Sequence, residues 1–221
     1  MHKDSITEYI RTRSLMLITH RTERFTEYDE ACLAIKGGCR WVQLRMKGTL
    51  NLEDARRIAA LCTENDTLLC IDDNIDIALA VRANGVHVGK NDMPIPEVWK
   101  RVEAAGRKDD FIVGATANTF DDIQKAADQG ASYIGLGPFR FTQTKEKLSP
   151  ILGTDGYRRI LQQCQETGIH LPVYAIGGIT PTDIPDLMQT GISGIAISGA
   201  IVNAENPITA TQHLTHIILN S

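Results

Sequence analysis

Charged side chains with the chemistry to bind phosphate recur in this sequence directly after short apolar runs. One group of four combines Arg45 and Lys47 with the carboxylates Asp73 and Asp92. Two aspartates are enough to hold Mg²⁺, which binds one or two carboxylates and shares the phosphate oxygens of a substrate. Arg would hold the remaining oxygens through two parallel hydrogen bonds and Lys as a point charge. The group predicts a metal-bound diphosphate; ordinary ion pairs among the same side chains are the alternative.

A second anion site is predicted from two glycine turns late in the chain, "AIGGIT" (175–180) and "ISGAI" (197–201). Glycine lets backbone N–H groups approach an anion, with a helix N-terminus behind them. Two ordinary glycine turns are the alternative. A monophosphate site together with a diphosphate site implies two phosphorylated substrates and a transfer between them.

These side chains need a framework that brings them together. Helical segments separate most of the expected strands, whose apolar residues on both faces are typical of a buried parallel sheet. Eight such units in 221 residues predict an α/β protein, a (β/α)8 TIM barrel. A doubly wound open sheet is the alternative, but no GxGxxG follows the first strand. The expected strands lie near residues 15–19, 41–45, 68–72, 85–89, 111–115, 133–137, 172–176 and 194–198.

Two helix starts and one helix interruption are predicted. Asn51 and Thr119 each precede apolar residues at helical spacing and have side chains that cap a helix N-terminus well. In "TPTDIPDL", Pro185 is expected to interrupt a helix that starts at Thr180. No linker, low-complexity run or composition shift divides the chain, so residues 1–221 are expected to form a single barrel domain.

The polar residues collect where the expected strands end. In a barrel the eight turns after the strands converge on one face, where barrel active sites lie. Loops are polar in any protein, but most strands here begin with small or uncharged residues, Arg40 excepted, which favours a functional face. The collected residues are Thr19, His20, Arg45, Lys47, Asp72, Asp73, Lys90, Asp92, Thr116, Thr142, Thr144, Lys145, Gly177, Gly178, Ser198 and Gly199.

Composition and charge narrow the partners. The formal charge of −4 and the absence of a long apolar run argue against nucleic acid and against a membrane span. The polar N-terminus is not expected to be a signal peptide. Five cysteines without a CxxC pair predict reduced, mostly buried thiols and a cytoplasmic location. Small-molecule substrates are the expected partners, and assembly into a homo-oligomer is left open.

Four segments resemble, in order and spacing, the motifs of the thiamine phosphate synthase (thiamine-phosphate pyrophosphorylase) family: "VQLRMK", "IDDNIDIALAVRANGVHVGKNDMP", "GPFRFTQTKEK" and "YAIGGIT". The resemblance runs from about Leu15 to Ile201. It implies a (β/α)8 barrel with Mg²⁺ as cofactor. It also implies a transferase of thiamine biosynthesis, which joins hydroxymethylpyrimidine diphosphate to hydroxyethylthiazole phosphate and releases pyrophosphate.

The matched motifs assign roles to residues of this chain. Arg45, Lys47 and Lys145 would be catalytic, because they would stabilise the departing pyrophosphate. Asp73 and Asp92 would ligate the metal. The implied substrate-binding residues are Gln43, Arg45, Lys47, Asp72, Thr116, Thr142, Thr144, Lys145, Gly178, Ser198 and Gly199.

Some positions depart from the family's motifs. Asp72 replaces the usual Asn and adds a negative charge beside the metal, which Lys90, in place of the usual Gln, would offset. Phe141 and Gln143 replace two prolines, so the loop after the sixth strand is expected to be less stiff. The other departures are Met16 for Tyr, His20 for Asp, and a serine one position earlier in "ISGAI".

Two single residues and three rival functions complete the expectations. His87 alternates with valines and is expected to be a hydrogen-bonded core histidine, whereas Arg140 is expected to face solvent. The rivals are a thiazole tautomerase-like isomerase, a sugar-phosphate isomerase and a non-enzymatic sensor of a phosphorylated ligand. None of them explains the joint presence of Arg45, Lys47 and Lys145 with two metal carboxylates.

Overall fold

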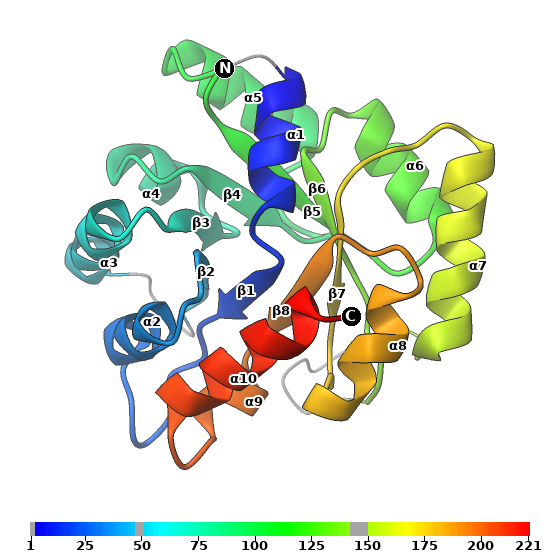
Figure 1. The fold of residues 1–221 in the computed structure, drawn as a ribbon. Helices are drawn as coiled ribbons and strands as arrows, with labels where there is room; N and C mark the ends of the chain where they lie inside the picture. Colours follow the sequence, from blue (N-terminus) through cyan, green and yellow to red (C-terminus); the bar gives the residue numbers. More distant parts are fainter. Residues whose placement is uncertain (1–2, 47–50, 142–149) are drawn as a thin grey trace.

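The computed structural model describes residues 3–46, 51–141 and 150–221, and its strands form one closed parallel barrel (Figure 1). The strands pair in chain order, and β1 closes the barrel against β8, with Leu15 opposite Ile195. The predicted (β/α)8 barrel is confirmed, and the open sheet is wrong. The strands are β1 (Leu15–Ile18), β2 (Trp41–Leu44), β3 (Leu68–Asp72), β4 (Gly85–Val88), β5 (Ile112–Ala117), β6 (Tyr133–Leu136), β7 (Val173–Ile176) and β8 (Gly194–Ile197).

Helices surround the barrel on its outside (Figure 1). Each strand is followed by a helical segment before the next strand begins, as the βα rhythm of the sequence predicts. The helical elements are α1 (Lys3–Arg11), α2 (Glu27–Lys36), α3 (Leu52–Glu64), α4 (Ile75–Ala80), α5 (Ile95–Ala104), α6 (Phe120–Asp128), α7 (Gly153–Glu166), the 3-10 turn η1 (Pro181–Asp183), α8 (Ile184–Met188), α9 (Gly199–Val202) and α10 (Pro207–Leu219).

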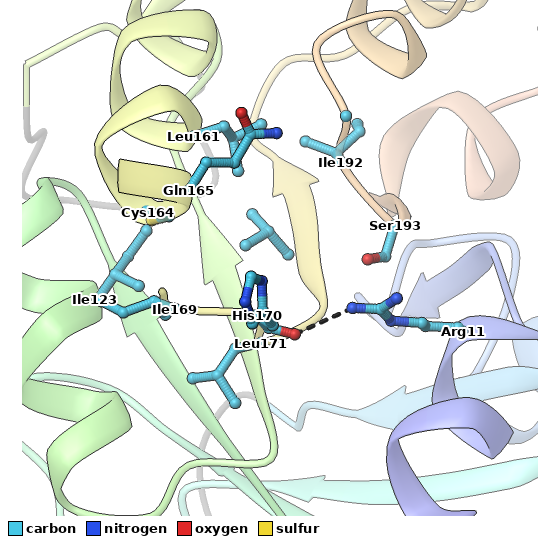
Figure 2. Close-up of a pocket in the computed structure, with 12 residues that line it drawn as sticks. Arg11, Ile123, Leu161, Cys164, Gln165, Ile169, His170, Leu171, Ile192 and Ser193 are labelled. Carbon is cyan, nitrogen blue, oxygen red and sulfur yellow. Dashed lines mark hydrogen bonds between the residues drawn. The ribbon is translucent and has the colours of Figure 1, made fainter. Parts of the chain in front are cut away.

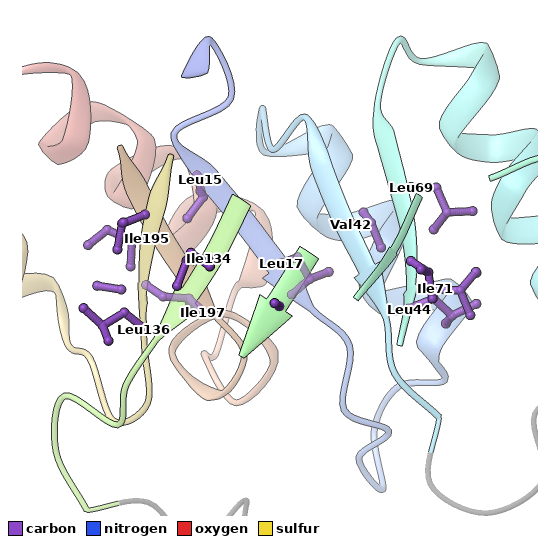
Figure 3. Close-up of a cluster of buried hydrophobic side chains, with 14 of the residues drawn as sticks. Leu15, Leu17, Val42, Leu44, Leu69, Ile71, Ile134, Leu136, Ile195 and Ile197 are labelled. Atoms are coloured by element: carbon purple, nitrogen blue, oxygen red, sulfur yellow. The ribbon is translucent and has the colours of Figure 1, made fainter. Parts of the chain in front are cut away.

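Alternate residues of each strand face the helices or the barrel interior, because side chains of a strand alternate between its two faces. The outward set packs against the helices and forms the larger hydrophobic cluster. Figure 3 shows part of this outer layer, including Leu15 and Leu17 of β1 and Val42 and Leu44 of β2. The residues between them point inward, and Gln43 is therefore directed into the barrel.

Large aromatic side chains fill the barrel interior. The ring of Trp41 packs edge-on against those of Tyr133 and Tyr174, at centroid distances of 4.8 and 4.9 Å. Gly114 of β5 leaves room for Tyr133, since a Cβ at this position would overlap the Tyr133 ring. Ile10 of α1 is fully buried in the same cluster, so α1 covers the end of the barrel where the strands begin.

The helix starts follow from local capping. The Asn51 side chain accepts a 2.9 Å hydrogen bond from the Glu53 N–H at the start of α3. Thr119 and Asp122 form a reciprocal capping box at the start of α6. Both predicted helix starts are therefore confirmed. Pro185 lies in the first turn of α8, where its missing N–H costs no hydrogen bond, and η1 precedes it.

All five cysteines lie in the described part of the chain and are free thiols, four of them buried. Within residues 3–46, 51–141 and 150–221, no helix has both the length and the apolar character that a bilayer crossing requires.

Candidate functional site

Polar contacts cross the barrel where β2 and β3 end. The Asp72 carboxylate, at the last position of β3, accepts a 2.5 Å hydrogen bond from Nε2 of Gln43 on β2. Its other oxygen lies 3.4 Å from Nε of Arg45. Because a carboxylate only accepts hydrogen bonds, Gln43 presents its NH₂ group to Asp72. The structure thus brings together three of the predicted substrate-binding residues.

His87 connects this group to the predicted residue Thr116. Its side chain is buried, with Nε2 at 2.9 Å from the Thr116 hydroxyl and Nδ1 at 3.0 Å from the Tyr133 hydroxyl. The Tyr133 hydroxyl in turn lies 3.5 Å from Oε1 of Gln43. The expectation of a hydrogen-bonded core histidine is confirmed. Tyr133 was missed because a tyrosine inside an apolar strand gives no signal of its polar contacts.

Asp73 lies in a tight turn directly after β3. Its φ of +62° is in the left-handed region, where Asp and Asn are more common than most residues. The Asn74 N–H donates to the Asp72 carbonyl at 2.8 Å, and the Asn74 side chain then caps α4. This turn holds the Asp73 carboxyl at the end of the barrel where the strands finish.

The electrostatic environment of Asp73 is unusual. Loss of solvation, the negative charge of Asp72 and a hydrogen bond with Asp92 raise the pKa of Asp73 to about 7, while Arg45 acts in the opposite direction. The hydrogen bond places the two carboxyl groups against each other. One Asp92 oxygen also accepts a 2.8 Å hydrogen bond from the Gly89 N–H.

The two carboxyl groups suit a divalent cation. Like charges held together raise a pKa, and a cation between them would relieve the repulsion. The described residues contain no group of three or more His, Cys, Asp or Glu side chains placed to hold a metal. A pair of carboxylates fits Mg²⁺, which takes few protein ligands and fills its other positions with water and substrate phosphate.

The second predicted anion site lies after β7 and β8. Gly177 and Gly178 have φ values of +94° and +70°, which glycine adopts without strain. The Ser198 hydroxyl oxygen is shielded from solvent and has no hydrogen-bond partner among the described residues. Gly199 begins α9, whose first N–H groups lack acceptors within the helix. Backbone donors and a hydroxyl are thus available to an anion here.

Several predicted residues lie outside the part of the chain that the structure describes. They include two of the three predicted catalytic side chains. These residues are Lys47, Thr142, Thr144 and Lys145, together with the departure Gln143.

A cavity of about 370 Å³ lies at the opposite end of the barrel (Figure 2). Its lining includes His170 and Ser193, which precede β7 and β8, and Arg11, whose guanidinium donates to the His170 carbonyl at 3.0 Å. None of the described residues lining it is a predicted site residue. The cavity is therefore separate from the face that carries the polar network.

Comparison with known proteins shows which of the rival functions this chain has. A profile of the family described as thiamine monophosphate synthase matches residues 15–201, which is most of the chain. The chain belongs to the thiamine monophosphate synthase family.

Individual relatives agree with this family. The thiamine-phosphate synthases of Phocaeicola vulgatus and Bacteroides thetaiotaomicron are 48% and 46% identical to this chain, over 94% and 92% of its length and 99% and 97% of theirs. A thiamine phosphate pyrophosphorylase from Pyrococcus furiosus superimposes with a TM-score of 0.83 at 30% identity, covering 96% of this chain and 98% of that chain. The predicted family, the transferase class and the thiamine-phosphate synthase function are confirmed.

One expectation about a departure from the family's motifs is wrong. The Lys90 ammonium lies 2.5 Å from Asp122 at the start of α6, so it pairs there instead of offsetting Asp72. The Arg140 side chain is 48% exposed, as expected, and it also forms an ion pair with Asp183 at 2.8 Å. Sequence gives no signal for either partner, because loops far apart along the chain bring each pair together.

A buried side chain missed in the sequence is Glu30 of α2. Its carboxyl accepts a 2.7 Å hydrogen bond from the backbone N–H of His20, in the turn after β1. Burial raises the pKa of Glu30 to about 7, although the His20 N–H opposes that change. Glu30 therefore anchors the β1–α2 turn at the same end of the barrel as Asp73.

Proposed function

We propose that this protein transfers the pyrimidinylmethyl group of hydroxymethylpyrimidine diphosphate to hydroxyethylthiazole phosphate by a Mg²⁺-assisted dissociative substitution. Family membership supports the overall reaction, and the facing carboxyl groups of Asp73 and Asp92 are the observation that carries the mechanism. They lie beside Gln43, Asp72 and Arg45, which suit a diphosphate and the pyrimidine attached to it.

The bond that breaks joins the pyrimidine CH₂ carbon to a diphosphate oxygen. Its electron pair leaves with pyrophosphate, and the electron-rich aminopyrimidine ring stabilises the positive charge that remains on carbon. Arg45 donates hydrogen bonds to the departing phosphate oxygens, as do Lys47 and Lys145, so negative charge is stabilised as it develops. When bound to Asp73 and Asp92, Mg²⁺ would supply further positive charge to the same oxygens.

The bond that forms joins the thiazole nitrogen to the same carbon. That nitrogen carries no proton, so the reaction needs no general base. The protein must instead orient the substrates, so that the thiazole nitrogen faces the positively charged carbon while both substrates are bound. Gly178 and the Ser198–Gly199 turn bind the thiazole phosphate through backbone N–H groups and the Ser198 hydroxyl, while Thr142 and Thr144 contact the ring.

The interior hydrogen bonds would position the pyrimidine. Gln43, Thr116 and His87 lie on three strands, and their hydrogen bonds limit how each side chain can turn. Side chains that are already held by hydrogen bonds lose less conformational entropy when the substrate binds. They therefore favour a single orientation of the pyrimidine and of its reacting carbon. We also propose that the protein acts in the cytoplasm, in keeping with its free thiols.

Product formation from both substrates tests the proposal. Purified protein with both substrates and Mg²⁺ should give thiamine phosphate and pyrophosphate in equal amounts, and omission of either substrate should abolish both. Mass spectrometry and a pyrophosphate assay provide the measurement. A folded preparation that binds thiamine phosphate in a calorimeter without turnover would favour the sensor and contradict the proposal.

A further inference from the structure

Arg140 ties the turn after β6 to the turn after β7. Its Nη1 and Nη2 atoms donate to the two carboxylate oxygens of Asp183 at 2.9 and 2.8 Å. Nη1 also donates to the Gly178 carbonyl at 3.0 Å. Two parallel hydrogen bonds fix the orientation of a guanidinium as well as its distance. We call Arg140, Gly178 and Asp183 the Arg140 clasp.

The Asp183 end of the Arg140 clasp is fixed independently. The same carboxylate accepts hydrogen bonds from the Thr180 N–H at 2.8 Å and the Thr180 hydroxyl at 2.6 Å. Its side chain is 13% exposed, whereas that of Arg140 is 48% exposed. Burial acts to raise the pKa of Asp183, but the hydrogen bonds from Arg140 and Thr180 outweigh it and lower the pKa. Asp183 thus stays ionised and holds the start of α8 to the glycine turn.

Backbone contacts run alongside the Arg140 clasp. The Phe139 N–H donates to the Ile176 carbonyl at 2.9 Å, and the Arg140 N–H donates to the Gly177 carbonyl at 3.0 Å. A Cβ added to Gly178 would lie 2.9 Å from the Phe141 carbonyl oxygen. The two turns are therefore in close backbone contact.

We propose that Arg140 is a positioning residue, which sets the orientation of the glycine turn that receives the phosphate of the thiazole substrate. A trans peptide is planar, so holding the Gly178 carbonyl also fixes the following N–H group, that of Ile179, in the opposite direction. The Arg140 clasp thereby directs a backbone donor of the turn without touching the substrate. The inference rests on the proposed function, because it takes the Gly178 turn as the thiazole phosphate site.

Arg140→Ala tests this role. The variant should raise KM for the thiazole phosphate about tenfold while changing kcat and KM for the pyrimidine diphosphate by about threefold or less, because it disturbs binding of one substrate in particular. Steady-state rates with each substrate varied in turn provide the measurement. Equal increases in both KM values would overturn the proposal.

Arg107→Ala is the matched control. Arg107 also pairs with an aspartate, Asp110, through two nitrogens and also donates to a loop carbonyl, that of Ala83 at 2.9 Å. These contacts lie ahead of β4 and β5, at the far end of the barrel. Arg107→Ala should lower stability to urea at least as much as Arg140→Ala, since Arg107 is less exposed, yet leave both KM values unchanged. A rise in the thiazole phosphate KM of Arg107→Ala matching that of Arg140→Ala would overturn the proposal.

Two further measurements sharpen the test. One separates the hydrogen-bond geometry of Arg140 from its charge, and the other separates the role of Arg140 from the proposed function. Arg140→Lys keeps the positive charge but cannot donate two parallel hydrogen bonds from a planar group. It should therefore restore only part of the affinity for the thiazole phosphate that Arg140→Ala loses. Full restoration would overturn a role in orientation. Calorimetry with inorganic phosphate measures binding without turnover. If Arg140→Ala binds phosphate more weakly than Arg107→Ala, the role of the Arg140 clasp is supported even in an inactive preparation. Equal phosphate binding by the two variants would count against it.

Discussion

Replacing Asp73 by Asn should stabilise the fold while removing activity. The pKa of Asp73 rises from an ordinary value of 3.8 to about 7. The contribution of this carboxyl to stability is complete below about pH 4 and is lost as pH rises to about 7, because ionisation is harder in the folded state. Asparagine carries no charge and accepts a φ of +62° as well as aspartate does, so it avoids the loss without new backbone strain.

The size of this gain follows from the shift. Three pKa units correspond to about 4 kcal/mol in the absence of screening. Asp73 loses only part of its solvation and remains in contact with solvent, and screening reduces such energies strongly, so we expect a gain of about 1 kcal/mol at pH 8. Urea unfolding in the presence of a chelator, at pH 4.5 and at pH 8, measures it. Added Mg²⁺ should then stabilise the wild-type protein but not the variant.

Asp66→Asn is the control for this experiment. Asp66 also has a positive φ, of +45°, but its side chain is 85% exposed and lies 3.3 Å from Arg13. Its replacement should change the free energy of unfolding by less than about 0.5 kcal/mol. The difference in unfolding free energy between this variant and the wild-type protein should be the same at pH 4.5 and pH 8. If Asp73→Asn is no more stable than the wild-type protein at pH 8, or matches Asp66→Asn, the folded state does not disfavour the ionised Asp73 carboxylate and the reasoning is wrong.

Two other substitutions follow from the same contacts. Asp72→Asn should lower the pKa of Asp73, because it removes a neighbouring negative charge; carboxyl carbon NMR across a pH series measures this, and an unchanged titration would contradict it. Gly114→Ala should destabilise the fold by about 1 to 3 kcal/mol in urea, because the added methyl group overlaps the Tyr133 ring, whereas unchanged stability would mean that the barrel interior is loosely packed.

Sequence predicts the barrel well because its signals are local. Short runs of mostly apolar residues between glycine turns give strands such as Trp41–Leu44 and Gly194–Ile197, whose observed ends lie within one residue of those expected. Caps such as Asn51 and Thr119 depend only on neighbours in the chain. The predicted site residues Gln43 and Asp72 meet because parallel strands of a barrel end on the same face.

The sequence could not predict which charged side chains of different loops form ion pairs with each other. Lys90 meets Asp122 only after β4 and β5 are placed, and Arg140 meets Asp183 only after β6 and β7 are placed, so neither pair leaves a spacing pattern. The raised pKa of Asp73 likewise depends on solvation and on the approach of Asp92 from another turn. These interactions tune the site, whereas local patterns determine the fold that carries it.

Dependence of pyrophosphate release on a divalent cation tests the proposed chemistry of this face. With both substrates present, release should stop on addition of excess chelator and return when Mg²⁺ is restored, and Asp73→Asn should remain inactive at every Mg²⁺ concentration while staying folded. Full turnover in excess chelator, or wild-type rates from Asp73→Asn, would show that the carboxyl pair of Asp73 and Asp92 does not serve the reaction.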